Sequence, residues 1–127
     1  MQQRDQSVKD SQGTAVAAGL DGTAKMDALN ALGHFYLRHM QTDKAIILFR
    51  ALHKLQPQNP RITLSLAYAH YLAGDPQEAA TLSSPLLQQD TPLQRAASIL
   101  YSRALIKLGR NKEARQILRQ PLTSEEI

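Results

Sequence analysis

A pattern that recurs at intervals of 34 and then 35 residues constrains this chain more than any other feature of its sequence. Ala45, Ala79 and Ala114 mark the same position in three similar segments. Gly74 and Gly109 stand five residues before the second and third alanines, and glycine suits the tight turn that ends one helix and lets the next fold back. Repetition at such an interval is typical of stacked helical units. The sequence therefore predicts three helical hairpins in a row.

The apolar residues between positions 26 and 120 recur at helical rather than alternating intervals, as in Leu29, Leu32, Phe35 and Tyr36. This spacing predicts six helices and no sheet. We expect them at roughly 27–40, 43–55, 60–73, 76–89, 92–108 and 111–120.

Helix starts are marked by capping residues followed by proline. Asn59 and Thr91 each precede a proline that suits the first helical position, and Asp75 precedes another. Pro85 lies inside the fourth expected helix, where it removes a backbone hydrogen bond and clashes with the preceding turn. We expect that helix to kink or end early at Pro85.

The first copy resembles the tetratricopeptide repeat (TPR) family. It carries the residues that this family places at fixed positions: Leu32-Gly33, Tyr36, Ala45, Phe49 and Pro57, with Leu29 in place of the usual tryptophan. The second copy keeps the register, and the third has lost the Leu-Gly pair. The resemblance covers residues 26–121. It implies an all-α fold in which three TPR-like hairpins form a short right-handed superhelical solenoid.

The two ends of the chain differ from this repeat region. Residues 1–25 contain only Val8, Val16 and Leu20 as large apolar groups, which is too little to offset the entropy of ordering. We expect this segment to be disordered, with a vector-derived sequence or a short partner-binding arm as alternatives. Residues 122–127 are expected to form a C-terminal tail.

The chain lacks the features of secreted and membrane proteins. Its sequence contains no cysteine and no apolar run long enough for a signal peptide or a membrane span. We therefore expect a cytoplasmic protein.

Positive charge is concentrated near the end of the repeat region. Between positions 95 and 119 only Glu113 opposes seven basic residues: Arg95, Arg103, Lys107, Arg110, Lys112, Arg115 and Arg119. One interpretation is a surface for an acidic partner or a nucleic acid. The interpretation we favour is that these residues form solvated helix faces, because no aromatic residue that could stack on bases follows Tyr101. We do not expect nucleic-acid binding.

The sequence offers little for catalysis or for a metal. His34, His39, His53 and His70 are scattered over different helices, in a spacing that does not suit metal ligation. There is no cysteine nucleophile, no glycine-rich phosphate loop and no serine in a nucleophile-elbow context. We predict a non-enzymatic protein without a cofactor, a metal or catalytic residues.

Binding to a protein is the remaining function. The resemblance implies that the first helix of each hairpin lines a concave groove, and the register then gives twelve groove residues: Asn30, His34, Leu37, Arg38, Leu64, Tyr68, Tyr71, Leu72, Ile99, Arg103, Ile106 and Lys107. Tyrosine suits such a groove because its ring packs on apolar groups while its hydroxyl bonds to a backbone. Two alternatives are that some of these rings pack into the hairpin core, or that the N-terminal segment covers them.

The last hairpin is short of a cap. After Leu118 the chain has too few residues for a helix that would cover its stacking surface. A second copy of the chain, a co-chaperone or a helix of a client protein could supply that cover.

Residues Leu29–Pro57 also resemble the first repeat of the small TPR chaperones of bacterial type III secretion systems. That resemblance implies a chaperone that holds an export substrate, such as a translocator, needle subunit or early secreted component, soluble in the groove until export. The alternative is a general TPR adaptor or assembly scaffold that binds a peptide segment of its partner. An RNA-binding repeat protein that uses the basic 95–119 face ranks last.

Overall fold

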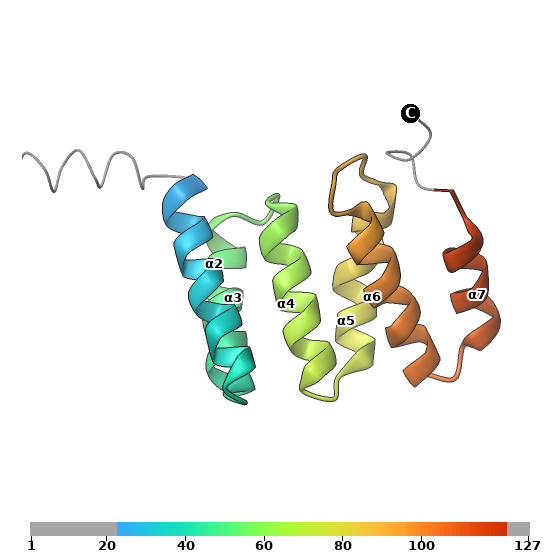
Figure 1. Cartoon of the computed structure of the whole chain (residues 1–127), viewed down its shortest axis with the longest axis horizontal. Coiled ribbons are helices and arrows are strands. Elements are labelled where there is room, and N and C mark those ends of the chain that lie inside the picture. Colours follow the sequence, from blue (N-terminus) through green and yellow to red (C-terminus); the bar gives the residue numbers. More distant parts are fainter. Residues whose placement is uncertain (1–22, 122–127) are drawn as a thin grey trace, which may run out of the picture.

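The chain folds into a row of helical hairpins. The computed structural model describes residues 23–121, which hold six α-helices, one 3-10 helix and no strand (Figure 1). In chain order these elements are α2 (Thr23–Arg38), α3 (Thr42–Leu55), α4 (Pro60–Leu72), α5 (Pro76–Ser83), the 3-10 helix η1 (Ser84–Gln88), α6 (Gln94–Lys107) and α7 (Asn111–Arg119). The prediction of an all-α solenoid of TPR-like hairpins is confirmed. Of the segment 1–25 that we expected to be disordered, positions 1–22 lie outside the described residues, as does the tail 122–127, whereas positions 23–25 form the start of α2, four residues earlier than expected.

Two of the expected helix starts are capped as the sequence predicts. The Asn59 side chain accepts hydrogen bonds from the backbone N–H groups of Arg61 and Ile62, at 3.1 and 3.5 Å. The Asp75 carboxylate accepts one from the N–H of Glu78, at 3.2 Å. Each bond satisfies a donor that the first turn of a helix leaves without an intrahelical partner.

The prolines at 85 and 92 act differently. Pro85 ends α5 at Ser83, as expected, and the chain continues as η1. The expectation that Pro92 opens the next helix is wrong, because α6 begins at Gln94 and Pro92 lies in the turn before it. The physical reason is local hydrogen bonding: the Thr91 hydroxyl accepts from the N–H of Leu93 at 3.2 Å, which satisfies this donor within the turn.

The three alanines of the repeat are buried where neighbouring helices pack together. Ala45 and Ala79 have no exposed surface, and Ala114 is 1% exposed. Ala45 belongs to the main core, which fills the space between α2, α3 and α4 around Phe49. A smaller cluster forms between α5 and α6, where Ala79 and Ala80 pack with Ala104. Small side chains at these positions set how close the helices come.

The absence of a side chain at Gly33 leaves room for the Phe49 ring inside the first hairpin. A Cβ at Gly33 would lie 2.9 Å from the Phe49 Cδ1 and would overlap two further ring atoms, Cε1 and Cζ. Phe49 is fully buried, so its ring has no free space to move into. At the equivalent positions of the second hairpin stand Ala67 and Ser83, which are also fully buried. A larger side chain on the first helix is thus matched by a smaller one on the second.

The turns inside the hairpins use a left-handed residue at one fixed position. Gly74 has φ +85° and Gly109 has φ +80°, as expected for glycine at a helix C-terminus. Met40 holds the same position in the first hairpin, with φ 60° and a side chain that is 89% exposed. A residue with a Cβ is strained in this region of backbone conformation. The first turn therefore carries a strain that the other two avoid.

Replacing Gly33 with alanine should lower the free energy of unfolding by about 1–3 kcal/mol, because the added methyl group overlaps a ring that cannot move. Chemical denaturation followed by circular dichroism measures the change. The double variant Gly33→Ala/Phe49→Leu should lose less than the sum of the two single variants, because the smaller leucine makes room. Additive losses would show that the contact does not limit this site.

Replacing Met40 with glycine should raise the free energy of unfolding by about 0.5–1 kcal/mol, because glycine relieves the strain and part of the gain is offset by its greater freedom in the unfolded chain. The urea midpoint at unchanged slope reports this. Met40→Ala is the matched control: it also removes the exposed side chain but keeps the Cβ, so it should bring no gain. A gain in both variants would contradict the explanation.

Candidate functional site

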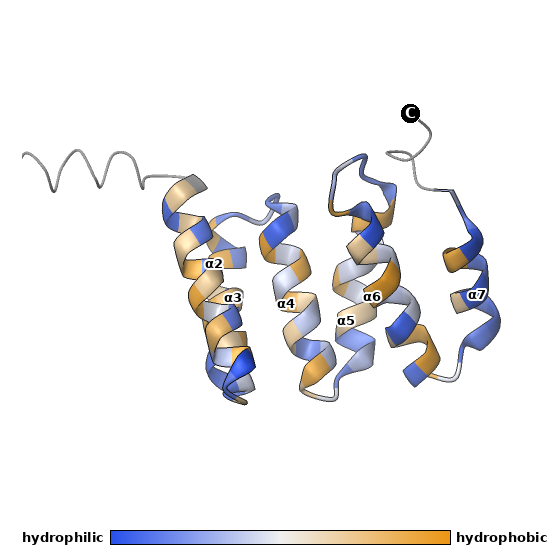
Figure 2. Ribbon diagram, viewed as in Figure 1, coloured by the Kyte–Doolittle hydropathy of each residue, from blue (hydrophilic) through white to orange (hydrophobic). Residues whose placement is uncertain are grey.

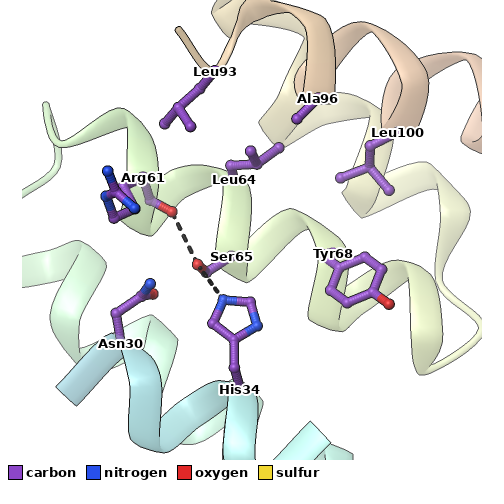
Figure 3. A pocket seen from close by; sticks show the side chains of 9 residues that line it. All are labelled: Asn30, His34, Arg61, Leu64, Ser65, Tyr68, Leu93, Ala96 and Leu100. Atoms are coloured by element: carbon purple, nitrogen blue, oxygen red, sulfur yellow. Dashed lines mark hydrogen bonds between the residues drawn. The ribbon is translucent and has the colours of Figure 1, made fainter. Parts of the chain in front are cut away.

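A cavity of about 280 Å³ lies between α2, α4 and the start of α6 (Figure 3). Figure 3 shows Leu93, Ala96 and Leu100 on one side of it and Asn30 and His34 on the other. The four remaining lining residues, all from α4, are Arg61, Leu64, Ser65 and Tyr68. The α6 wall is apolar and the α2 wall is polar, so the cavity presents two chemically different walls to a ligand.

Ser65 joins α4 to the polar wall on α2 through one hydroxyl group. Its O–H donates to the backbone carbonyl oxygen of Arg61 at 3.0 Å, within α4. The same oxygen lies 3.0 Å from the Nε2 of His34 on α2. When the single proton of the serine hydroxyl is donated to Arg61, the His34 Nε2–H donates to Ser65. In that arrangement the His34 Nδ1 is an acceptor.

The His34 ring stands between the core and the cavity. Its centroid is 5.3 Å from that of the buried Phe49 ring and 6.5 Å from that of Tyr68, on which it stacks. The pKa of His34 is lowered below its ordinary value, chiefly because burial disfavours the charged form and also because the positive charge of Arg38 opposes it. His34 is therefore a neutral hydrogen-bonding group at pH 7.

Asn30 places an unused acceptor beside the cavity. The side chain is 8% exposed, and its Oδ1 atom has no hydrogen-bond partner within residues 23–121. A buried polar atom without a partner costs free energy of the order of 1–3 kcal/mol. Turning the Asn30 amide so that this atom meets an N–H group of a ligand would recover part of that cost.

The polar wall continues into a second hollow of about 490 Å³, which shares Asn30, His34 and Arg61 with the first and is also lined by Asp27 and Arg38. The Arg61 Nε lies 3.9 Å from an oxygen of the Asp27 carboxylate, and both side chains are more than half exposed. Such an ion pair is weak and leaves Arg61 able to contact another group.

The structure brings together only part of the expected groove. Asn30, His34, Leu64 and Tyr68 line the cavity, and Arg38 lines the adjoining polar hollow. Five further residues are exposed but do not line either hollow: Leu72, Ile99, Arg103, Ile106 and Lys107.

Two expected groove residues belong to the hairpin interior. Leu37 is 9% exposed and packs in the main core, so the expectation that it faces the groove is wrong. It lies on the side of α2 that meets α3 and α4. Tyr71 is partly buried and packs on the alanine cluster between α5 and α6. This agrees with the alternative that some of the rings pack into the core.

Five lining residues were missed: Arg61, Ser65, Leu93, Ala96 and Leu100. The signal for those on α4 was present, because Arg61, Leu64, Ser65 and Tyr68 have the i, i+3, i+4, i+7 spacing of one helix face. No such signal existed for Leu93, because it lies in the turn before α6, within the range where the sequence predicted the start of that helix.

Within residues 23–121 no group of three His, Asp or Glu side chains could hold a metal ion. Among the same residues, no helix has the length and apolar character needed to cross a membrane.

The stacked hairpins define the protein as a TPR-like repeat array. Residues 38–121 match the family described as anaphase-promoting complex, cyclosome, subunit 3, and this range is well over half of the 127-residue chain. The chain belongs to this family, which is one of TPR-like repeats. Such families serve as protein-interaction modules and are generally not catalytic. No curated protein matches the chain.

The lowered pKa of His34 makes stability depend on pH. A histidine with a lower pKa in the folded chain binds fewer protons when folded, so unfolding is favoured as pH falls below the unfolded value of about 6.5. The melting temperature of the native chain should fall more steeply between pH 7 and pH 5 than that of His34→Gln. Replacing the exposed His39 with glutamine is the control and should retain the native slope. Equal slopes in all three proteins would contradict the lowered pKa of His34 in the folded chain.

Proposed function

We propose that this chain binds a segment of a protein partner in the cavity between α2, α4 and α6. The observation that carries the proposal is the pairing of an apolar wall with a buried, unpartnered acceptor at Asn30. A polypeptide segment supplies both complements: an apolar side chain for Leu93 and Leu100, and a backbone N–H for the Asn30 Oδ1 once the amide turns towards the cavity.

The size of the cavity suits part of a protein rather than a cofactor. Pockets that enclose small molecules commonly measure about 300–1,000 Å³, so this cavity of about 280 Å³ is just below that range and has room for about one or two side chains. Tyr68, 38% exposed, borders the cavity and offers both a ring and a hydroxyl to a bound segment. His34, neutral at pH 7, adds the Nδ1 acceptor.

We favour an adaptor or assembly scaffold as the biological use of this binding. The family to which the chain belongs is named for a subunit of a multiprotein complex, the anaphase-promoting complex or cyclosome. A module that holds a segment of a neighbouring subunit fits such a setting.

The second use is a cytoplasmic chaperone for a type III secretion substrate. It rests on the resemblance of Leu29–Pro57 to the first repeat of those chaperones. In that case the bound segment would be an amphipathic or extended part of the export substrate, kept from self-assembly until export. A co-chaperone or a second copy at the C-terminal hairpin belongs to the same proposal.

Replacing Ala96 with tryptophan tests the cavity directly. Ala96 is exposed on α6 and lines the cavity, so a large ring there fills the space without disturbing the core. Peptides selected from a random displayed library on the native chain should bind Ala96→Trp at least tenfold more weakly. Ala51→Trp is the matched control: this alanine is exposed on α3 outside the cavity, so the affinity should not change. Equal affinity for both variants would overturn the assignment of the site.

Affinity capture from the lysate of the source organism then separates the two uses. The native chain and Ala51→Trp serve as baits, and Ala96→Trp is the negative bait. A single small secreted protein recovered in near-equal amount indicates the chaperone. Recovery of several subunits of one assembly indicates the adaptor.

A further inference from the structure

The third hairpin carries an exposed face that mixes apolar and basic side chains. Ile99 and Ile106 of α6 are 40% and 52% exposed, Leu118 of α7 is 55% exposed, and Arg103 and Arg115 are exposed beside them. The three α6 residues have i, i+4, i+7 spacing and the two α7 residues i, i+3 spacing, so each set shares one helix face. We call these five residues the end face. Figure 1 shows α7 at the end of the row, and Figure 2 shows that this helix is mostly hydrophilic.

The repeat shows what this face is built for. A shift of 35 residues, the second interval of the repeat, leads from Ile106, Arg115 and Leu118 back to Tyr71, Ala80 and Ser83. Ala80 is 4% exposed and packs with Ala104 of α6, and Tyr71 packs against the same cluster. In the second hairpin this surface is therefore covered by the first helix of the next hairpin. In the third hairpin no helix of residues 23–121 covers it.

Charge distinguishes the end face from the equivalent surfaces. Arg115 stands where the second hairpin has Ala80 and the first has Ile46, which packs against the main core. Arg103 stands where the second hairpin has Tyr68. Within residues 23–121 neither arginine has an ion-pair partner. A further hairpin of the same kind would remove water from both guanidinium groups without offering them a carboxylate, which is costly.

We propose that the end face binds an amphipathic helix of a different protein, in which Asp and Glu side chains flank an apolar stripe. The stripe would pack on Ile99, Ile106 and Leu118, and the flanking carboxylates would pair with Arg103 and Arg115. A helix fits because a helix covers the equivalent surface of the second hairpin. The acidic flanks supply the partners that both arginines lack, so covering the face leaves no charge unpaired.

The charge of the chain disfavours a second copy of itself as the occupant. The net charge is +4, and the region 95–119 contains seven Lys and Arg residues with Glu113 as its only carboxylate. This carboxylate is already bonded to Arg110, at 2.6 and 2.8 Å. Two end faces brought together would therefore repel each other. A nucleic-acid backbone would pair with the arginines, but its phosphates would not pack on the three apolar side chains.

The end face is separate from the candidate binding cavity. None of its five residues lines the cavity or the adjoining polar hollow. The inference therefore goes beyond the proposed function, and either can fail without the other. It commits the cover of the last hairpin to a helix of another protein.

Selection from a displayed library of amphipathic helices tests the chemistry of the partner. Each helix carries leucines along one face, its flanking positions vary among Asp, Glu, Lys, Arg and Gln, and the full native chain is the bait. We expect Asp and Glu to be enriched in the helices that bind. Their affinity should fall at least about fivefold between about 50 and 500 mM salt, because dissolved ions screen the paired charges. Selected helices without this enrichment, or no bound helix, would overturn the proposal.

Reversing the charge at Arg115 tests the place of binding. Arg115→Glu should weaken the selected acidic helix at least about tenfold, because attraction becomes like-charge repulsion. The same helix with lysines in place of its acidic residues should bind Arg115→Glu more tightly than the native chain, which also shows that the variant is folded. Arg50→Glu is the matched control: Arg50 is exposed on α3 and the change gives the same net charge, so it should bind as the native chain does. Equal weakening by both variants would mean attraction to net charge alone and would overturn the proposal.

Three further measurements separate the other occupants. Ala96→Trp, which fills the cavity, should bind the acidic helix as the native chain does, and loss of binding would overturn this inference while leaving the proposed function intact. Deletion of residues 122–127, which include Glu125 and Glu126, should leave the affinity unchanged. Binding that appears only after this deletion would make the tail the occupant and would overturn the proposal. A single-stranded RNA of about 20 nucleotides that displaces the helix at a lower concentration than the free helix does would overturn it in favour of a nucleic acid.

Discussion

The close approach of the two helices in each hairpin is the constraint on which the whole row depends. It is possible because buried alanines stand at the same place in α3, α5 and α7. The residue on the first helix also varies in size: it is Gly33 where the second helix carries Phe49, and Ala67 where the second helix carries Ser83. The distance within a hairpin fixes where its first helix stands relative to the next hairpin. The cavity between α2, α4 and α6 exists because these distances place three first helices side by side.

The middle and the ends of the row meet different conditions. In the middle, α4 is packed on both neighbours, and its face towards α2 carries Ser65, whose hydroxyl links the two helices through His34. At one end, α2 keeps the packing face of its repeat but has no neighbour in the described residues to cover it. At the other end, Ala114 is the only buried residue of α7. The side chain of Arg110, the N-cap residue of α7, forms a bidentate salt bridge with Glu113 at the exposed start of this helix. The central helix is thus held between the helices of both neighbouring hairpins, and the terminal ones are not.

Much of the fold could be predicted from the sequence because the signals are local and repeated. Alanine spacing, turn glycines and the caps at Asn59 and Asp75 each act through neighbouring atoms, and the structure confirms them. The site was harder to predict, because a register alone does not show whether a side chain turns towards the groove or the core. Leu37 is such a case: its position on α2 is on the border between the two, and packing against α3 and α4 decided it. The Met40 turn could not be anticipated from composition, since methionine is rare in a left-handed conformation.

The position of the cavity between α2, α4 and α6 has a mechanical consequence. In a row of hairpins each unit packs mainly on its neighbours in the chain, so a disturbance at one end reaches the other only through the units between them. A segment seated in the cavity touches α2, α4 and α6 at once and so joins the first hairpin directly to the third. Occupancy would then change the row from a flexible stack into a stiffer body, whose curvature is set by the bound segment as well as by the helices.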